Sequence, residues 1–225
     1  DPGTAPLTSD YPYRQFLGSL SFISLNARPD IAYAVNQCAR FANEPTVLCW
    51  QALTRILAYL VHTIDYAIVF RRDHKHTHDV EVYSDSDHMG SYNSKGELRI
   101  AFKAQTQKRP SQSSSESELY ADVPACKQAL YVQNLLAELD GTPPVAYKLY
   151  GDNDAMLLTN NRDSQKSRLR HIEARYWFTR DQVQAMKCTL HRGDSADNPA
   201  DIFTKPLPRA QFTKLLSMLM ARNLT

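Results

Sequence analysis

The stretch Val80-Glu81-Val82-Tyr83-Ser84-Asp85-Ser86-Asp87 decides the fold class of this chain. From Val80 to Ser84 its residues alternate as in a β-strand, and the strand ends on the carboxylate of Asp85. A second apolar segment, Val145 to Gly151, ends on Asp152 in the same way. If these two strands are parallel neighbours, both carboxylates emerge at the same edge of the sheet, where α/β proteins place their sites.

The sequence beyond Thr77 alternates between strand and helix patterns. The predicted elements, in chain order, are an antiparallel strand at 98–102, a helix at about 116–139, a basic helix around 169–183, a strand at 189–191, a helix beginning at Pro199 with Asn198 as its cap, and an amphipathic helix around 212–219. Strands followed by helices, with an early hairpin, predict a mixed α/β sheet.

The first part of the chain has helical patterns instead. Asp30 is predicted to cap a helix through Ala42, and Thr46 a second helix with apolar positions every three to four residues. A short strand follows at 66–70, and then the composition shifts to a histidine-rich segment at 71–78 with nothing to bury. We therefore predict a helical segment and linker at 1–78 and a separate domain at 79–225. The linker residues His74, His76 and His78 have metal-compatible spacing, but solvated histidines are the favoured interpretation.

Composition limits the function classes only loosely. The chain has 225 residues and a formal net charge of +2, so a nucleic-acid partner would need a local basic surface. Its four cysteines lie far apart, which is typical of reduced thiols in an intracellular protein. We find no signal peptide and no long apolar run, and expect a soluble chain. Because it begins at Asp1, we expect a fragment or a processed product.

Four acidic residues carry the predicted chemistry. Asp85 and Asp152 close strands, while Glu118 and Asp201 are predicted in the first turns of helices, where the helix dipole favours the ionised form. Carboxylates without Cys or His suit Mg²⁺ or Mn²⁺ rather than zinc. Two such ions about 3.5–4 Å apart can activate a water and stabilise the leaving oxygen of a phosphodiester.

Each acid taken alone has an ordinary structural explanation. Ser115-Glu116-Ser117-Glu118 is a good capping box, and Asp201 follows Asn198 at capping distance. Asp85 and Asp152 could be turn residues at strand ends. The joint order of the four, on strand, helix, strand and helix, is what favours a catalytic site.

The ordered motifs resemble the end of the Pol polyprotein of Ty1/copia-type retrotransposons over nearly the whole chain. Segments similar to the end of its reverse transcriptase are Tyr13-Arg14-Gln15-Phe16-Leu17-Gly18-Ser19-Leu20, Ala27-Arg28-Pro29-Asp30-Ile31-Ala32-Tyr33-Ala34-Val35 and Trp50-Gln51-Ala52-Leu53-Thr54-Arg55-Ile56-Leu57-Ala58-Tyr59-Leu60. Segments similar to its ribonuclease H region are Tyr83-Ser84-Asp85-Ser86-Asp87, Ser115-Glu116-Ser117-Glu118, Gly151-Asp152-Asn153, Arg170-His171-Ile172 and Asn198-Pro199-Ala200-Asp201-Ile202-Phe203-Thr204-Lys205-Pro206-Leu207.

This resemblance implies a ribonuclease H-like mixed five-stranded sheet flanked by helices, preceded by a small helical thumb or connection segment of reverse transcriptase. It implies endonucleolytic hydrolysis of the RNA strand of RNA–DNA hybrids, with Asp85, Glu118, Asp152 and Asp201 holding two Mg²⁺ or Mn²⁺ ions. The implied partners are the hybrid and the upstream polymerase domain, without a membrane, in the cytoplasm (in virus-like particles) and the nucleus. The Tyr-x-Asp-Asp polymerase motif is absent, so this chain is not expected to polymerise DNA by itself.

Other residues are secondary candidates. His191 precedes Asp201 by ten positions, much as a mobile histidine precedes the last acid in cellular ribonuclease H, and could assist product release or proton transfer; a strand-end histidine without a role is as good an interpretation. Lys166, Arg168, Arg170 and Arg175 are candidates for binding the phosphates of the hybrid, although a solvated helix face is the default explanation of such a run.

Three departures from the family pattern leave room for a different function. His88 stands where the family usually has Trp, the hairpin at 90–108 is shortened, and Pro124 lies inside the helix that carries Glu118, where it predicts a kink. One alternative is a catalytically weak or domesticated module that binds hybrids or contacts a subunit. A second is an integrase or resolvase on a similar sheet, against which Glu118 discriminates.

Overall fold

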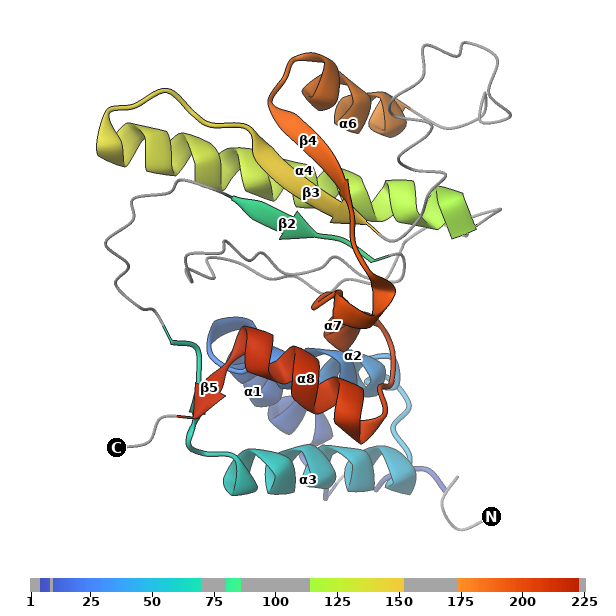
Figure 1. Cartoon of the computed structure of the whole chain (residues 1–225). Helices are drawn as coiled ribbons and strands as arrows, with labels where there is room; N and C mark the ends of the chain where they lie inside the picture. The colour runs from blue at the N-terminus through green and yellow to red at the C-terminus, as the bar shows by residue number, and fades with distance from the viewer. Residues whose placement is uncertain (1–4, 9, 70–79, 86–113, 152–173, 223–225) are drawn as a thin grey trace. The chain divides into compact units, whose positions relative to one another are not determined.

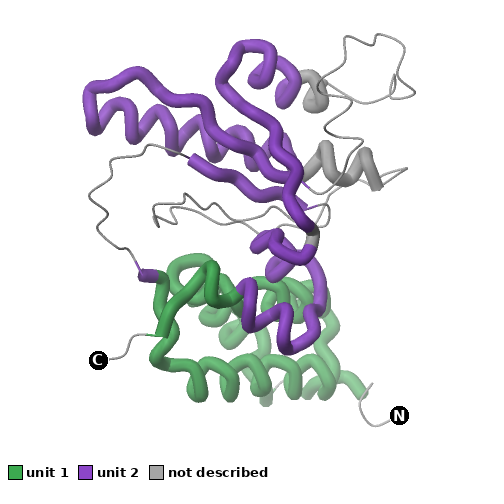
Figure 2. Tube along the Cα trace, viewed as in Figure 1, with its two compact units in different colours: residues 1–68, 216–225 green, residues 69–215 purple. Residues whose placement is uncertain are grey.

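The computed structural model describes residues 5–8, 10–69, 80–85, 114–151 and 174–222, with the backbone alone at 114–121, 174–177 and 195. The chain divides into two compact units (Figure 2). Unit 1 comprises residues 1–68 together with 216–225, and unit 2 comprises residues 69–215. The predicted division at 78/79 remains a prediction, and the return of the last ten residues to unit 1 was not foreseen in the sequence.

A parallel three-stranded sheet forms the centre of unit 2 (Figure 1). Its strands are β2 (Glu81–Tyr83), β3 (Tyr147–Gly151) and β4 (Cys188–Arg192), in the order β2-β3-β4. Tyr83 is in register with Tyr150, and Tyr150 with His191. The predicted strands are thereby confirmed, and the strands that precede Asp85 and Asp152 are parallel neighbours.

One face of this sheet is apolar and packs against the two helices α4 (Ser114–Asp140) and α6 (Ala174–Gln184). Because side chains alternate along a strand, Val82, Leu149 and Leu190 share this face. The buried core there consists of Val80, Val82, Ala125, Cys126, Ala129, Val132, Tyr147, Leu149 and Cys188. The opposite face of the strands carries polar and aromatic residues that belong to the candidate site.

Helix α4 is longer than predicted and runs without a break across Pro124. Proline has no N–H to donate, so the carbonyl of Tyr120 lacks its usual partner one turn later. The helix begins at Ser114, so Glu118 is its fifth residue and lies beyond the first turn. The prediction that Glu118 lies in the first turn of its helix was therefore wrong.

The end of unit 2 consists of short helices after β4. These are η3 (Ser195–Asp197), α7 (Asp201–Thr204) and the start of α8 (Arg209–Leu219). The prediction of a helix beginning at Pro199 was wrong by two residues, because Asn198 Oδ1 accepts a hydrogen bond from the Ala200 N–H at 3.0 Å and holds a turn there. The apolar stripe of the last helix is confirmed, since Leu215, Leu216 and Leu219 are buried.

Unit 1 is helical, as predicted. Its elements are α1 (Tyr13–Asn26), η2 (Pro29–Ile31), α2 (Ala32–Ala39), α3 (Val47–His62) and the strand pair β1 (Tyr66–Ala67) and β5 (Ala221–Arg222). The helices enclose a core of Tyr13, Leu17, Leu20, Ile31, Val35, Cys38, Leu53 and Ile56. The helix predicted to run through Ala42 ends at Ala39 instead, and Phe41 beyond it is exposed.

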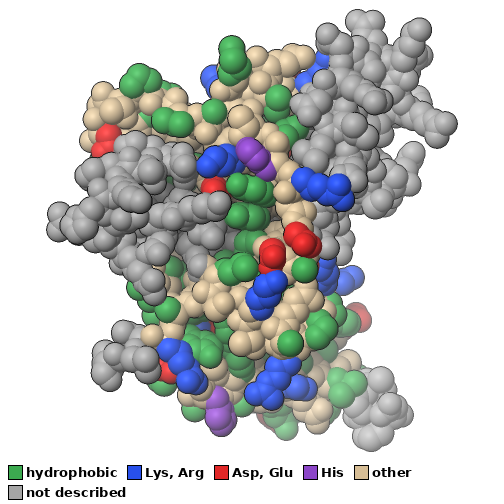
Figure 3. All heavy atoms as spheres, viewed as in Figure 1, with side chains coloured by type: hydrophobic (Ala, Val, Ile, Leu, Met, Phe, Trp, Pro, Cys, Tyr) green, Lys and Arg blue, Asp and Glu red, His purple; other side chains and the backbone are tan. Residues whose placement is uncertain are grey.

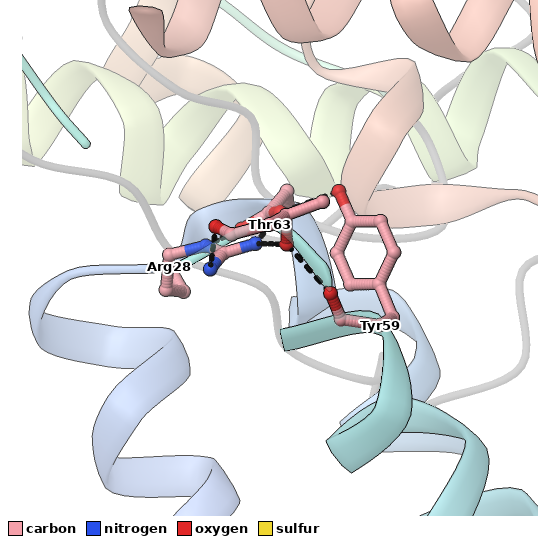
Figure 4. A network of polar contacts seen from close by, with 4 residues as sticks. Arg28, Tyr59 and Thr63 are labelled. Carbon is pink, nitrogen blue, oxygen red and sulfur yellow. Dashed lines mark hydrogen bonds and ion pairs between the residues drawn. The ribbon is translucent and has the colours of Figure 1, made fainter. Parts of the chain in front are cut away.

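A network of polar contacts around the buried ion pair of Arg28 with Asp30 joins the α1–η2 connection to the end of α3 (Figure 4). Arg28 donates two hydrogen bonds to the Asp30 carboxylate, at 3.0 and 2.8 Å, and two more to Thr63 O and Oγ1. Tyr59 OH donates to Asp30 Oδ2 at 2.7 Å. Burial, and next the charge of Asp30, raises the pKa of Tyr59. The predicted role of Asp30 as a helix cap was wrong, because its carboxylate is engaged by Arg28 and Tyr59 instead.

Several other expectations are settled by the described residues. Thr46 is the residue before α3, as predicted, but makes no capping hydrogen bond. All four cysteines are free thiols, as predicted. None of the described helices is long and apolar enough to cross a bilayer. The described chain is thus mixed α/β, whereas the strand predicted at 98–102 and the histidine-rich linker lie outside the described residues.

Replacing Arg28 with Ala should destabilise unit 1 by about 3 kcal/mol, because removing one partner of a buried pair leaves the other charge uncompensated. Urea unfolding would be followed by Trp50 fluorescence in a Trp177→Phe background. As a matched control, Arg40→Ala removes an exposed arginine that donates a hydrogen bond to Gln37, and should change the free energy of unfolding by less than about 0.5 kcal/mol. Equal effects of the two substitutions would contradict the prediction.

Candidate functional site

Two of the predicted acids, Asp85 and Asp201, both lie close to the ammonium group of Lys205. Lys205 Nζ lies 2.9 Å from Asp201 Oδ2 and 3.9 Å from Asp85 Oδ2. The side chains of both aspartates are buried, at 8% and 1% exposure, while that of Lys205 is 43% exposed. Thr204 Oγ1 also donates to Asp85 Oδ2, at 2.5 Å. The structure therefore brings together residues that are 116 positions apart in the sequence, 85 and 201.

The position of Asp85 is fixed through its neighbour Ser84. The Ser84 N–H donates to Tyr150 O at 3.2 Å, and Ser84 O accepts from Asn198 Nδ2 at 3.0 Å. The Ser84 hydroxyl donates to Asp122 Oδ1 at 2.7 Å. Contacts to β3, to the turn before α7 and to α4 thus hold the end of β2 from three directions.

Helix α7 presents Asp201 and Thr204 to the same place. Asp201 is the first residue of the helix, and the Asp201 N–H donates to Asn198 O at 3.2 Å. Four residues make little more than one turn, so Thr204 and Lys205 return to the side of Asp201. Asn198 therefore fastens both the end of β2 and the start of α7, which explains how the two carboxylates come together.

Asp122 is a fully buried carboxyl group next to the site. Burial raises its pKa to about 7, although the hydrogen bond from Ser84 acts in the opposite direction. Its second oxygen, Oδ2, has no hydrogen-bond partner in the described part of the chain. The residue lies one helical turn after Glu118 on α4, a spacing that places both on the same side of the helix.

An aromatic row lies on the same face of the sheet as Asp85. The rings of Tyr83 and Tyr150 are stacked with centroids 4.8 Å apart, and His191 is tilted against Tyr150 at 5.2 Å. Both tyrosine hydroxyls reach the buried carboxylate of Glu81, at 3.3 and 3.4 Å. His191 Nε2 is 2.9 Å from Thr189 Oγ1. Thus His191 is on the face that carries Asp85, one residue before the end of β4.

The remaining predicted site residues stay predictions. Asp152, Lys166, Arg168 and Arg170 lie outside the described residues. Glu118 and Arg175 belong to α4 and α6, of which the backbone is described at those positions.

Sequence reasoning overlooked the residues that surround the two visible aspartates. Lys205 follows Asp201 by four positions within the same motif, a spacing that favours an ion pair. Asp122 stands among apolar residues of α4, where a charged residue is rare unless it has a buried partner. Those two signals are present in the sequence, whereas the contacts of Ser84 and Asn198 depend on the tertiary fold.

The donors gathered here suit a hard cation. Asp85 and Asp201 offer carboxylate oxygens, and they already share one positive charge. Within the residues whose side chains are described, there is no group of three or more His, Cys, Asp or Glu side chains that would complete a metal site. Glu118 and Asp152 remain the predicted further ligands.

Comparison with known proteins identifies the family. In an alignment of 226 positions that covers 95% of its length, the chain is 32% identical to the retrovirus-related Pol polyprotein from transposon RE1 of Arabidopsis thaliana. It is 32% identical to that from transposon RE2 of the same plant and 30% identical to that from transposon TNT 1-94 of Nicotiana tabacum, each over 89% of its length. It spans 14 to 16% of the length of these relatives.

The chain belongs to the Pol polyproteins of Ty1/copia-type retrotransposons, as a segment of one. No family model matches it, and no solved structure does. The resemblance predicted from the ordered motifs is therefore confirmed by sequence comparison.

The raised pKa of Asp122 predicts a pH-dependent stability. Below about pH 4 the group is protonated in both folded and unfolded chains. As pH rises from about 4 to 7, the unfolded chain ionises first, so the wild type loses up to about 4 kcal/mol of stability. Asp122→Asn stays neutral and keeps an oxygen to accept from Ser84, so this loss should be absent in the variant.

Urea unfolding from pH 4 to 8 would measure the difference in stability between Asp122→Asn and the wild type. That difference should grow in favour of the variant up to about pH 7. Asp181→Asn changes an exposed carboxylate on α6 and should give a difference that does not vary with pH. A flat difference for Asp122→Asn would show that its carboxyl group ionises alike in the folded and unfolded chains.

Proposed function

We propose that this segment is a ribonuclease H domain that cuts the RNA strand of RNA–DNA hybrids. The observation that carries the proposal is the meeting of Asp85 and Asp201 beside the carboxyl end of a parallel sheet. The membership of the chain in retrotransposon Pol polyproteins supports an enzymatic role, because these are enzymatic polyproteins. The order β2-β3-β4, with α4 and α6 on one face, agrees with a ribonuclease H-like fold.

The strand register supports Asp152 as the third acid. Tyr83 pairs with Tyr150, and Asp85 and Asp152 each come two positions later in the sequence. An equal offset from one registered pair is what a shared site at the end of two parallel strands requires. Glu118 contributes from α4, whose residue Asp122 already contacts the end of β2 through Ser84.

Asp85, Glu118, Asp152 and Asp201 would hold the divalent cations in this proposal. When bound, Mg²⁺ or Mn²⁺ would supply activation of water and stabilisation of the leaving oxygen. Thr204 orients the Asp85 carboxylate through a hydrogen bond, while Asn198 holds the carbonyl of the preceding Ser84 and Asp122 holds its hydroxyl. These contacts hold Asp85 in place before any ligand binds, which lowers the cost of reorganisation.

His191 is proposed as an auxiliary residue. Its ring is tilted against Tyr150, and it stands on the face that carries Asp85. A histidine at such a position can exchange a proton with a product phosphate. Replacement would then slow turnover without weakening hybrid binding.

Phosphate binding is proposed for the basic segment before and within α6. On the face drawn in Figure 3, the coloured Lys and Arg side chains occur singly or in small groups rather than as a continuous stripe. Lys166, Arg168, Arg170 and Arg175 would supply the concentrated positive charge that a hybrid needs.

The central test is cleavage of a labelled RNA–DNA hybrid, with duplex DNA and duplex RNA as controls. Cleavage should require Mg²⁺ or Mn²⁺ and stop in excess chelator. Asp152→Asn should abolish cleavage while hybrid binding and melting temperature stay close to wild type, because the amide keeps the size but loses the charge that holds the cation. Asp140→Asn, on the last residue of α4, is the matched control and should cleave normally.

A catalytically silent binding module is the alternative, and the same assay separates the two. Cleavage by Asp152→Asn at the wild-type rate would indicate that the carboxylates have a structural role rather than a catalytic one. Hybrid binding without any cleavage by the wild type, at every metal concentration, would favour the module.

Replacing both Arg168 and Arg170 with Ala should weaken hybrid binding and reduce its salt dependence. Each phosphate contact releases counterions, so two lost contacts should lower the slope of log affinity against log salt by about two. Fluorescence anisotropy with a labelled hybrid at several salt concentrations measures this. The double variant Arg40→Ala with Arg55→Ala in unit 1 removes the same charge and should leave the slope unchanged. A slope that moves equally in both would point to net charge rather than to contact.

A further inference from the structure

The proposed function does not explain why the ammonium group of Lys205 lies between two of the proposed metal ligands. It contacts the Oδ2 atom of both Asp85 and Asp201. A residue that only stabilised the fold would not need to bind the very oxygens that a divalent cation requires. The placement suggests competition between the two cations.

We propose that Lys205 is a built-in placeholder cation that holds Asp85 and Asp201 together until a divalent metal ion displaces it. This inference rests on the proposed metal-binding function of the site. It concerns a positioning residue, since Lys205 acts through the two carboxylates.

Geometry makes simultaneous binding unfavourable. Oxygen ligands lie about 2.0–2.1 Å from Mg²⁺. Since Lys205 Nζ is 2.9 Å from Asp201 Oδ2, a metal on the same oxygen would be at most about 5 Å from the ammonium nitrogen. Two positive charges so close repel at a partly buried site, so the binding of one cation weakens the binding of the other.

The environment of the three residues determines which cation leaves. The aspartates are buried and fixed by Thr204, Ser84 and Asn198, whereas the Lys205 side chain is nearly half exposed. Lysine carries its charge on a flexible stem of four carbons and is well solvated in water. The ammonium can therefore swing outward without disturbing the fold, while the carboxylates stay in place for the metal.

The same arrangement solves an electrostatic problem of the metal-free protein. Two buried carboxylates next to each other repel, and this repulsion works against keeping both at the site. The Lys205 side chain supplies the opposite charge. The backbone N–H of Lys205 also donates a hydrogen bond to the backbone carbonyl of Asp201, at 3.2 Å. The site is thus kept assembled in the absence of metal.

The two roles give opposite signs in one variant, which a purely structural role does not. Lys205→Gln should lower the melting temperature of the metal-free protein, because the carboxylates lose their counter-charge. It should also bind Mn²⁺ about threefold to tenfold more tightly, since the metal no longer displaces two partly exposed ion pairs. Mn²⁺ binding would be measured by electron paramagnetic resonance of the free ion, without nucleic acid.

Two variants serve as controls. Lys205→Arg keeps the charge and should bind Mn²⁺ within about twofold of the wild type. Lys214→Gln makes the same change of net charge but removes an ion pair with the exposed Asp197, and should also leave Mn²⁺ affinity unchanged. In the wild type, acetylation of Lys205 by a water-soluble ester should increase when Mn²⁺ is added, whereas acetylation of Lys214 should not; this readout needs no variant to fold.

Equal or weaker Mn²⁺ binding by Lys205→Gln, with unchanged acetylation of Lys205, would overturn the placeholder inference and leave the proposed function standing. If the wild type and all variants bound no Mn²⁺ at millimolar concentration, the proposed metal site and the inference would both fail.

Discussion

The parallel register of β2 with β3 is the constraint on which the candidate site depends. It places the carboxyl ends of both strands at one edge of the sheet, and the alternation of side chains then decides which residues share a face. A slip of one residue would send Asp85 to the apolar face, among Val82 and Leu149. The core of unit 2 therefore does more than stabilise the sheet: by burying one set of side chains, it fixes the direction of the acids on the other set.

Much of this arrangement is legible in the sequence because it follows from local patterns. The strands around Val82, Leu149 and Leu190 and the last helix were predicted from periodicity and are confirmed. The misplacements have local physical causes. Asn198 makes a turn with Ala200 instead of capping a helix at Pro199, and the Asp30 carboxylate binds Arg28 rather than a helix N-terminus. In both cases the side chain of a residue type suited to capping accepts a hydrogen bond from a different nearby group.

What sequence patterns could not supply is the set of long-range contacts that aim the acids. Asn198 Nδ2 reaches Ser84 O and Asp122 reaches the Ser84 hydroxyl, and neither partner is foreseeable from spacing. The pairing of Lys205 with Asp201 was accessible, since the two are one turn apart, but its contact with Asp85 was not. Family membership, confirmed by comparison, supplied the order of the motifs and not the geometry that joins them.

The buried polar groups of the two units serve different ends. In unit 1, Arg28, Asp30, Tyr59 and Thr63 satisfy one another within one closed network, as expected of polar groups that hold helices in place. In unit 2, the Asp122 carboxyl group has one oxygen bonded to Ser84 and one without a partner in the described chain, and its charge is disfavoured by burial. Such an arrangement costs stability near neutral pH, and in proteins a cost of this kind is concentrated where groups are arranged for chemistry rather than for folding alone. Because Asp122 acts on the residue before Asp85, that cost falls at the proposed catalytic end of the sheet.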